Sequence, residues 1–281
     1  MIPAPFDYDV AESVDHAIEL LGAGGGDAKL LAGGHSLIPA LKLRIARPSK
    51  LVDIGRLSDL AYVKDGGTHV AIGALTRHAA VASDTLLAEH CPIVSHTAGE
   101  IGDPQVRHRG TLGGTLAHGD PASDMPAVML ALGAELVARG KGGERVIPAA
   151  EFFTGVFETA LGADEMLVEA RVPKLAGSTG WAYLKENRRA QDWATVGVAA
   201  LVHRDDGKVA GASIGLVNMG ATPLRARAAE DALAGGASIA DAAALVTEGA
   251  DPPSDHAGSS EYRAHLAQVI ARRALEQAFA D

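Results

Sequence analysis

Two pairs of adjacent glycines stand out in this sequence, each beside a residue with a hydroxyl group. The first pair lies in AGGHS, residues 32–36, and the second in TLGG, residues 111–114. Glycine has no side chain, so the backbone N–H groups of such turns can approach a ligand closely. Where a turn of this kind opens a helix, free N–H groups point toward an anion. Two such turns could hold a pyrophosphate from two sides.

Each glycine pair by itself also fits an ordinary turn. The first is not the phosphate loop of a nucleoside triphosphatase, because no Gly-Lys-Ser/Thr follows it. It is also not the G-x-G-x-x-G of a dinucleotide-binding fold. From this segment alone, a plain turn and an anion-binding loop both stay open as interpretations.

Composition narrows the classes of function. The 281 residues include 35 acidic and 25 basic side chains, and the net charge of −10 disfavours binding to nucleic acid or to an anionic membrane. We expect no transmembrane segment, because no apolar run approaches the ~20 residues of a membrane span, and no secretory signal. Cys91 is the single cysteine, so no iron–sulfur cluster is ligated by this chain alone, and the scattered histidines predict no metal site.

A β–turn–α–β pattern carries the first glycine pair. The apolar run AKLLAG, from residue 28, predicts a strand before it, and residues 36–44 predict a short helix after it, with Pro39 tolerated in the first turn. Residues 51–54 predict the next strand. This order places the glycine pair where a strand ends and a helix begins.

The second glycine pair lies in a segment rich in glycine and proline, residues 102–124. We expect this segment to be irregular and functional. A strand over residues 69–74 and a helix over 92–102 precede it, and a buried helix follows it from residue 125. The composition then changes near Pro173.

Beyond that change, three apolar runs predict strands: WAYLKEN, ATVGVAALVHR and KVAGASIGLVNMG. A long helix is predicted over residues 261–280. We therefore expect an α+β domain whose small sheet is covered by helices on one face.

Four motifs together resemble one family: AGGHSLIPALKLR, IGDPQVRHRGTLGG, HGDPASDMPA and the pattern Y-x-K-x2-R-x3-D-x-A that begins at Tyr183. They are similar to the FAD-binding medium subunits of the molybdenum hydroxylases, in the xanthine oxidase family. Within that family the chain most resembles the medium subunits of aerobic, molybdenum- and copper-containing carbon monoxide dehydrogenases. The resemblance covers the whole chain.

The resemblance implies an α+β fold in two domains. Residues 1–176 would form a two-lobed FAD-binding domain of the vanillyl-alcohol-oxidase/PCMH type, with lobes of about 1–53 and 54–176. Residues 177–281 would form a small C-terminal flavoprotein domain with a three-stranded antiparallel sheet and helices.

The resemblance also implies which residues hold a noncovalent FAD. Two loops would wrap its pyrophosphate: Ala32, Gly33, Gly34, His35 and Ser36, then Thr111, Leu112, Gly113, Gly114 and Thr115. Asp124 matches an aspartate that accepts hydrogen bonds from cofactor hydroxyls. Lys185 matches a lysine near the flavin ring, where a cation would favour the reduced anionic flavin. Trp193 stands where carbon monoxide dehydrogenases carry a tyrosine against the isoalloxazine.

Two of these positions depart from the family pattern. Thr115 replaces the usual asparagine, which keeps a donor but shortens its reach. Trp193 replaces the tyrosine, which preserves stacking but changes the polar tip.

Structural alternatives stay open for several of these residues. Asp124 could cap the helix that follows it, Lys185 could be an ordinary solvated lysine, and Trp193 could belong to the core. Tyr183 is expected in the core. His118 and residues 107–109 are expected at a loop surface or in contact with a partner chain.

The function implied is that of an electron-transfer flavoprotein subunit with no catalytic acid or base of its own. A large partner subunit would oxidise the substrate at a molybdenum cofactor, and a small partner subunit with two [2Fe-2S] clusters would pass the electrons to FAD. An external acceptor, a quinone or a carrier, would then receive them. The expected assembly is a dimer of heterotrimers in the cytoplasm or, through the complex, at the inner face of the membrane.

Three alternative functions remain from the sequence. The first is the FAD subunit of a dehydrogenase for an aromatic or N-heterocyclic compound. The second is a self-contained flavin oxidoreductase, and the third is a scaffold that has lost its flavin. The intact glycine loops argue against the third.

Overall fold

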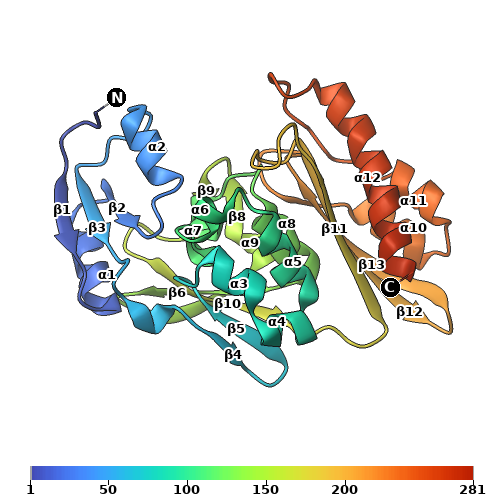
Figure 1. The fold of residues 1–281 in the computed structure, drawn as a ribbon, viewed down its shortest axis with the longest axis horizontal. Helices are drawn as coiled ribbons and strands as arrows, with labels where there is room; N and C mark the ends of the chain where they lie inside the picture. Colours follow the sequence, from blue (N-terminus) through green and yellow to red (C-terminus); the bar gives the residue numbers. More distant parts are fainter. Residues whose placement is uncertain (1, 281) are drawn as a thin grey trace.

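The computed structural model describes residues 2–280 and begins with a parallel sheet in the order β1-β3-β2 (Figure 1). Its strands are β1 (Asp7–Val10), β2 (Ala28–Leu31) and β3 (Lys50–Asp53), and its helices are α1 (Val14–Ala23) and α2 (Leu37–Lys42). The predicted β–turn–α–β order over β2, α2 and β3 is confirmed. Strand β1 was not anticipated, because its half-exposed sequence DYDV has no apolar run.

The middle of the chain forms an antiparallel sheet in the order β4-β5-β10-β6-β7. The strands are β4 (Val63–Asp65), β5 (His69–Gly73), β6 (Glu135–Gly140), β7 (Gly143–Pro148) and β10 (Met166–Pro173). The helices are η1 (Ser58–Leu60), α3 (His78–Ser83), α4 (Thr85–His90), α5 (Pro92–Glu100), α6 (Pro104–Arg107), α7 (Leu112–His118), α8 (Asp124–Leu132) and α9 (Ala149–Phe152). A small hairpin joins β8 (Phe153–Gly155) and β9 (Glu158–Thr159).

The segment 102–124 is not irregular, so that prediction was wrong: α6 and α7 lie within it. The side chain of Asp103 accepts a hydrogen bond from the N–H of Val106 at 2.9 Å, which caps α6. The hydroxyl of Thr111 accepts one from the N–H of Gly114 at 3.1 Å, which caps α7. The residues that suggested a loop are therefore helix boundaries.

The C-terminal part forms an antiparallel sheet in the order β11-β12-β13-β14. Its strands are β11 (Thr179–Glu186), β12 (Val196–Asp205), β13 (Lys208–Val217) and β14 (Leu224–Arg225), and its helices are α10 (Arg227–Ala234), α11 (Ile239–Ala244) and α12 (Ser260–Ala280). The sheet has one strand more than the three expected, because β14 is only two residues long and leaves no pattern in the sequence. Within residues 2–280, no helix has the length and apolar character needed to span a bilayer.

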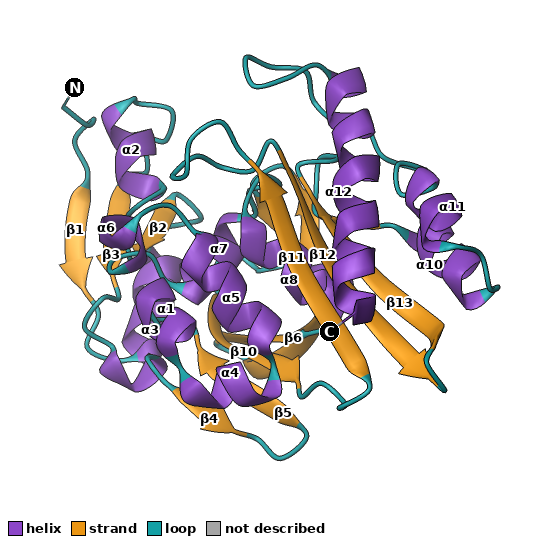
Figure 2. Ribbon diagram, turned by 45° about the vertical axis from the view of Figure 1, so that its right-hand side comes forward, coloured by secondary structure: helices purple, strands orange, loops and turns teal. Residues whose placement is uncertain are grey.

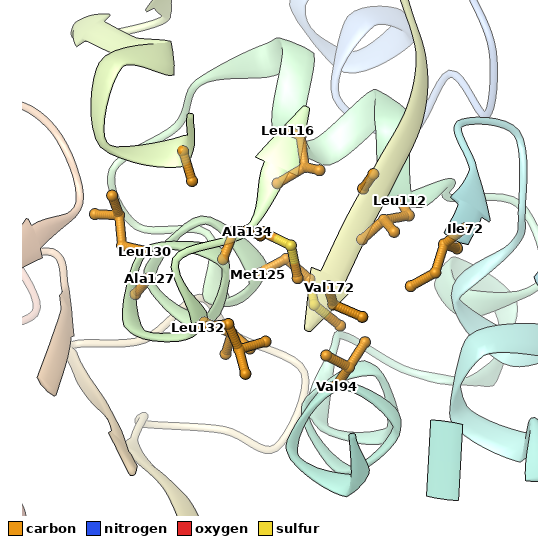
Figure 3. Close-up of a cluster of buried hydrophobic side chains, with 14 of the residues drawn as sticks. Ile72, Val94, Leu112, Leu116, Met125, Ala127, Leu130, Leu132, Ala134 and Val172 are labelled. Atoms are coloured by element: carbon orange, nitrogen blue, oxygen red, sulfur yellow. The ribbon is translucent and has the colours of Figure 1, made fainter. Parts of the chain in front are cut away.

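The helices of the C-terminal part itself, α10 to α12, lie on one face of its sheet, as expected, and α5 and α8 of the middle part cover the other face (Figure 2). Along β12, Val198 and Ala200 pack with the apolar side of α12, while Ala199 and Leu201 face the core that contains α8. This second core, shown in Figure 3, joins α7 and α8 to the middle sheet. The helices that carry the second and third sequence motifs are therefore held between two sheets.

Candidate functional site

The two glycine segments meet in space at Gly33. A Cβ atom at this position would lie 2.3 Å from the carbonyl oxygen of Arg109, just before the second glycine segment. The guanidinium of Arg77 donates a hydrogen bond to the same oxygen. Only a residue without a side chain can occupy position 33, and it brings the N-terminal lobe against the middle domain.

The first glycine segment presents a row of unused backbone donors. Within residues 2–280, the N–H groups of Gly33, Gly34, His35 and Ser36 donate to no protein acceptor. The turn depends on Gly34, whose φ of +74° lies in the left-handed region. The ring Nδ1 of His35 lies 3.1 Å from the carbonyl oxygen of Gly33, so the side chain contacts the backbone of the same turn.

The second glycine segment has no such free row. Its donors are already bonded at 2.8–3.1 Å, in the pairs Leu112 N–H to Thr76 O, Gly113 N–H to Ala74 O, Gly114 N–H to Thr111 Oγ1, and Thr115 N–H to Thr111 O. The free N–H groups thus belong to the first segment, while the second supplies hydroxyl groups.

Leu112 and Gly113 have a structural reason to be where they are. The Leu112 side chain is fully buried in the core (Figure 3). A Cβ on Gly113 would lie 2.5 Å from the Cβ of Ala74, so the glycine lets α7 pack on the end of β5. The hydroxyl of Thr115 lies 3.5 Å from that of Ser123, which connects this segment to the start of α8.

A cavity of about 300 Å³ opens beside the first glycine segment. Its lining includes Ala32, Gly33, Asp53, Arg56, Arg77 and Arg109. Three guanidinium groups against one carboxylate make this cavity suitable for a phosphate-bearing ligand. Sequence reasoning missed Arg56 and Arg77, because they lie outside the glycine motifs and no spacing marks them.

Asp124 and Lys185 form a buried ion pair. The Lys185 ammonium lies 3.1 Å from the Asp124 carboxylate, and their side chains are only 4% and 7% exposed, respectively. The same ammonium donates to the carbonyl oxygen of Glu100 at 2.9 Å. Ser123, and not Asp124, is the N-cap residue of α8. The capping interpretation of Asp124 and the solvated-lysine interpretation of Lys185 were both wrong.

Tyr183 completes this network. It is buried, as expected for a core residue, and its hydroxyl donates to the Asp124 carboxylate at 2.5 Å. Burial raises the pKa of Asp124 above its usual range, although Lys185 and the Tyr183 hydrogen bond oppose that shift. Burial and the adjacent carboxylate also raise the pKa of Tyr183 well above its ordinary value. No pattern in the sequence predicts the pairing of Tyr183 with Asp124.

Trp193 lies in the loop between β11 and β12 and is 63% exposed. The core interpretation of this residue was therefore wrong. The loop is anchored behind it: the fully buried Arg263 donates to the carbonyl oxygen of Thr195 and pairs with Asp255 at 2.5 Å. An exposed indole on an anchored loop is available for stacking, which stays a prediction.

His118 and Arg107 lie in helices and not at a loop surface. His118 ends α7, and its half-buried ring lies 4.9 Å from that of Phe157. The Arg107 guanidinium donates to the carbonyl oxygen of Ile101 at 3.0 Å, whereas Arg109 lines the cavity.

His78 contacts the residue before the second glycine segment, and its burial is expected to make the fold sensitive to acid. The backbone N–H of His78 donates to the carbonyl oxygen of Gly110 at 3.0 Å. Its buried ring Nδ1 has no hydrogen-bond partner among the described residues. Burial, with a contribution from Arg107 and Arg77, lowers the pKa of His78 to about 4.

We expect the stability of the chain to fall as the pH decreases from about 6.5 to about 4. In this range His78 binds a proton in the unfolded chain but stays neutral in the folded chain. This difference removes up to about 3 kcal/mol of unfolding free energy. Denaturant unfolding at several pH values measures this loss. His78→Leu should remove this part of the pH dependence; an unchanged pH slope would show that other groups cause it.

Comparison with known proteins gives matches over nearly the whole chain. Residues 4–175 match the family model of the FAD binding domain in molybdopterin dehydrogenase, and residues 181–278 match that of the CO dehydrogenase flavoprotein C-terminal domain. The carbon monoxide dehydrogenase medium chain of Hydrogenophaga pseudoflava is 42% identical, over 100% of this chain and 99% of that protein.

Two further matches define the range of this similarity. The alpha subunit of the 6-hydroxypseudooxynicotine dehydrogenase complex of Paenarthrobacter nicotinovorans is also 42% identical, over 99% of this chain and 96% of that protein. A solved structure of carbon monoxide dehydrogenase from Hydrogenophaga pseudoflava, which lacks the Mo-pyranopterin moiety, matches with a TM-score of 0.96 and 43% identity. It covers 100% of this chain and 99% of that one.

Proposed function

Because the chain belongs to the family of FAD-binding medium subunits of molybdenum hydroxylases, we propose that it holds one noncovalent FAD across its two glycine segments and passes electrons through it. The observation that carries this proposal is the row of four free N–H groups, Gly33 to Ser36, beside a cavity with three guanidinium groups. FAD, when bound, supplies both one-electron and two-electron transfer. The chain itself supplies binding, orientation and charge.

Different residues of the chain would bind the pyrophosphate and supply charge beside it. Ala32 to Ser36 would hold the pyrophosphate through backbone N–H groups, and Arg77 and Arg109 would add positive charge beside it. The hydroxyl groups of Thr111 and Thr115 would donate to the cofactor without adding charge. Thr115 is shorter than the usual asparagine, so we expect it to act directly or through a bridging water.

The residues near the C-terminal sheet would hold the flavin end of the cofactor. Lys185 would provide a cation whose charge is already compensated by Asp124, and the remaining acceptor capacity of Asp124 would serve the cofactor hydroxyls. Trp193 would cover one face of the isoalloxazine. In this arrangement residues 1–176 hold most of the FAD, and residues 177–281 complete its site.

The partners follow from the same proposal. A large subunit would carry the molybdenum cofactor, and a small subunit would carry two [2Fe-2S] clusters that deliver electrons to this chain. This division is supported by the single buried cysteine, Cys91, since such clusters need several thiolates. We further propose a cytoplasmic dimer of heterotrimers that reduces a quinone or a carrier.

The substrate has two candidates. Carbon monoxide is favoured by the match to the carbon monoxide dehydrogenase medium chains, at 42% and 43% identity. A nitrogen heterocycle or a related aromatic compound is supported by the 42% identity to the 6-hydroxypseudooxynicotine dehydrogenase subunit. In either case the substrate would be oxidised on the large subunit, so assays of the purified native complex with both classes of substrate distinguish them.

We expect denaturation of the purified complex to release one FAD per copy of this chain. No histidine or cysteine in the chain shows a flavin-linking pattern, so the flavin should leave the polypeptide when the fold is lost. Chromatography of the supernatant identifies the flavin and its amount. FMN in the supernatant, or flavin that stays with the precipitated polypeptide, would contradict the proposal.

A further inference from the structure

Exposed apolar side chains gather at one place on the N-terminal lobe. Of the eleven large apolar side chains that are exposed in residues 2–280, six lie within the first 45 residues. Four of them belong to the N-terminal segment and the turn after α2: Ile2 (81% exposed), Phe6 (36%), Leu43 (56%) and Ile45 (79%). We call these four residues, with Lys42, Arg44 and Arg47, the α2 surface.

The backbone holds this surface in place. Arg44 has a φ of +59°, in the left-handed region that non-glycine residues rarely adopt. Its guanidinium donates to the carbonyl oxygen of Ile2 at 3.2 Å, and its own carbonyl oxygen accepts from the Arg47 guanidinium at 3.1 Å. These contacts join the N-terminal segment to the turn and leave Leu43 and Ile45 facing solvent.

The charge of this surface is opposite to that of the chain. Residues 28–52 contain five basic residues and no acidic one, although the whole chain has a net charge of −10. Within residues 2–280, Lys42, Arg44 and Arg47 form no ion pair. Apolar residues surrounded by unpaired cations are suited to an apolar patch with an acidic rim on another protein.

The α2 surface also lies next to the cofactor loop. α2 begins at Leu37, directly after the free N–H groups of Gly33 to Ser36. The segment before α2 also contacts the segment after α6, because a Cβ at Gly33 would lie 2.3 Å from the carbonyl oxygen of Arg109. A redox protein that docks here would approach the pyrophosphate end of the site proposed to hold FAD.

We propose that the α2 surface docks the iron–sulfur subunit, through a face of that subunit with an apolar centre and acidic side chains around it. This inference rests on the proposed function, which requires an electron donor close to the FAD. A membrane is the less suitable occupant, because a chain of net charge −10 is repelled by anionic lipid, whereas a protein can match the local charge.

Co-expression of the three subunits tests this proposal, with a tag on the iron–sulfur subunit to capture the complex. Two variants change the surface, Ile45→Asp and the double variant Lys42→Glu/Arg47→Glu. Two matched variants change the same chemistry elsewhere: Val146→Asp on β7 and Lys208→Glu at the start of β13, both exposed. The amounts of this chain and of FAD are measured in the captured complex and in the unbound fraction.

We expect both surface variants to reduce the captured chain at least tenfold while the unbound chain keeps its FAD, and we expect both control variants to be captured like the wild type. Stoichiometric capture of both surface variants would overturn the inference. Normal capture together with lost binding to phosphatidylglycerol vesicles would assign the surface to a membrane instead. If the wild-type chain itself is not captured, the proposed function fails and not only this inference.

Discussion

Replacing Gly34 with valine is expected to lower the affinity for FAD on the order of 100-fold, which corresponds to about 2.8 kcal/mol. Two effects combine. The φ of +74° at this position strains a β-branched residue by about 1–2 kcal/mol, and the new methyl groups stand beside the row of free N–H groups. The protein atoms nearest to the new Cβ are the side-chain ends of Ile38, at 2.7 Å, and Leu31, at 3.2 Å. These two side chains can shift, so we expect most of the fold to be kept.

Flavin content after gel filtration and FAD titration of the apoprotein measure this effect. Gly211→Val is the matched control, because no atom lies within 4 Å of a Cβ at that position and β13 has ordinary backbone geometry there. The control should keep its flavin. Full flavin occupancy in Gly34→Val would show that this segment does not bind the pyrophosphate.

Replacing Asp124 with alanine should cost about 3–5 kcal/mol of unfolding free energy, because it leaves the Lys185 ammonium buried without its counter-charge. The effect should exceed that of an ordinary helix substitution, since the Tyr183 hydroxyl loses its acceptor at the same time. Denaturant unfolding of the chain measures the loss of stability, and a flavin assay measures the cofactor.

A double variant, Asp124→Ala/Lys185→Met, separates charge from cofactor contact. Removing both charges should restore most of the stability, because a buried pair replaced by apolar groups is often close to neutral. If the double variant regains stability but still lacks FAD, the pair contacts the cofactor. Equal instability of the single and double variants would show that the unpaired charge is not the cause.

Much of the fold could be predicted from local patterns in the sequence. The strand before the first glycine pair, the helix after it and the long C-terminal helix each carry their own apolar spacing and boundary residues. The irregular segment expected over residues 102–124 was wrong, because glycine and proline mark helix ends as well as loops. In this segment, Thr111 and Asp103 begin helices.

The site was less predictable, because its properties depend on contacts between distant residues. The N–H groups of Leu112 and Gly113 are occupied by Thr76 and Ala74, nearly forty residues earlier, and no local pattern reveals this. The pairing of Lys185 with Asp124 spans 61 residues. Arg56 and Arg77 reach the cavity only through the packing of the two lobes.

The anchoring of the Trp193 loop by Arg263 has a consequence for the order in which the site matures. The contact between Arg263 and Thr195 joins residues 68 apart in sequence, and α12 must dock before it can form. Contacts of such long range form late in folding, whereas β2, α2 and the first glycine segment are adjacent in the chain and can assemble early. If the first glycine segment binds the pyrophosphate as proposed, a newly made chain would form that segment before it forms a closed pocket for the flavin ring. Cofactor loading would then proceed from the pyrophosphate toward the ring, and defects in α12 would yield chains that capture FAD loosely.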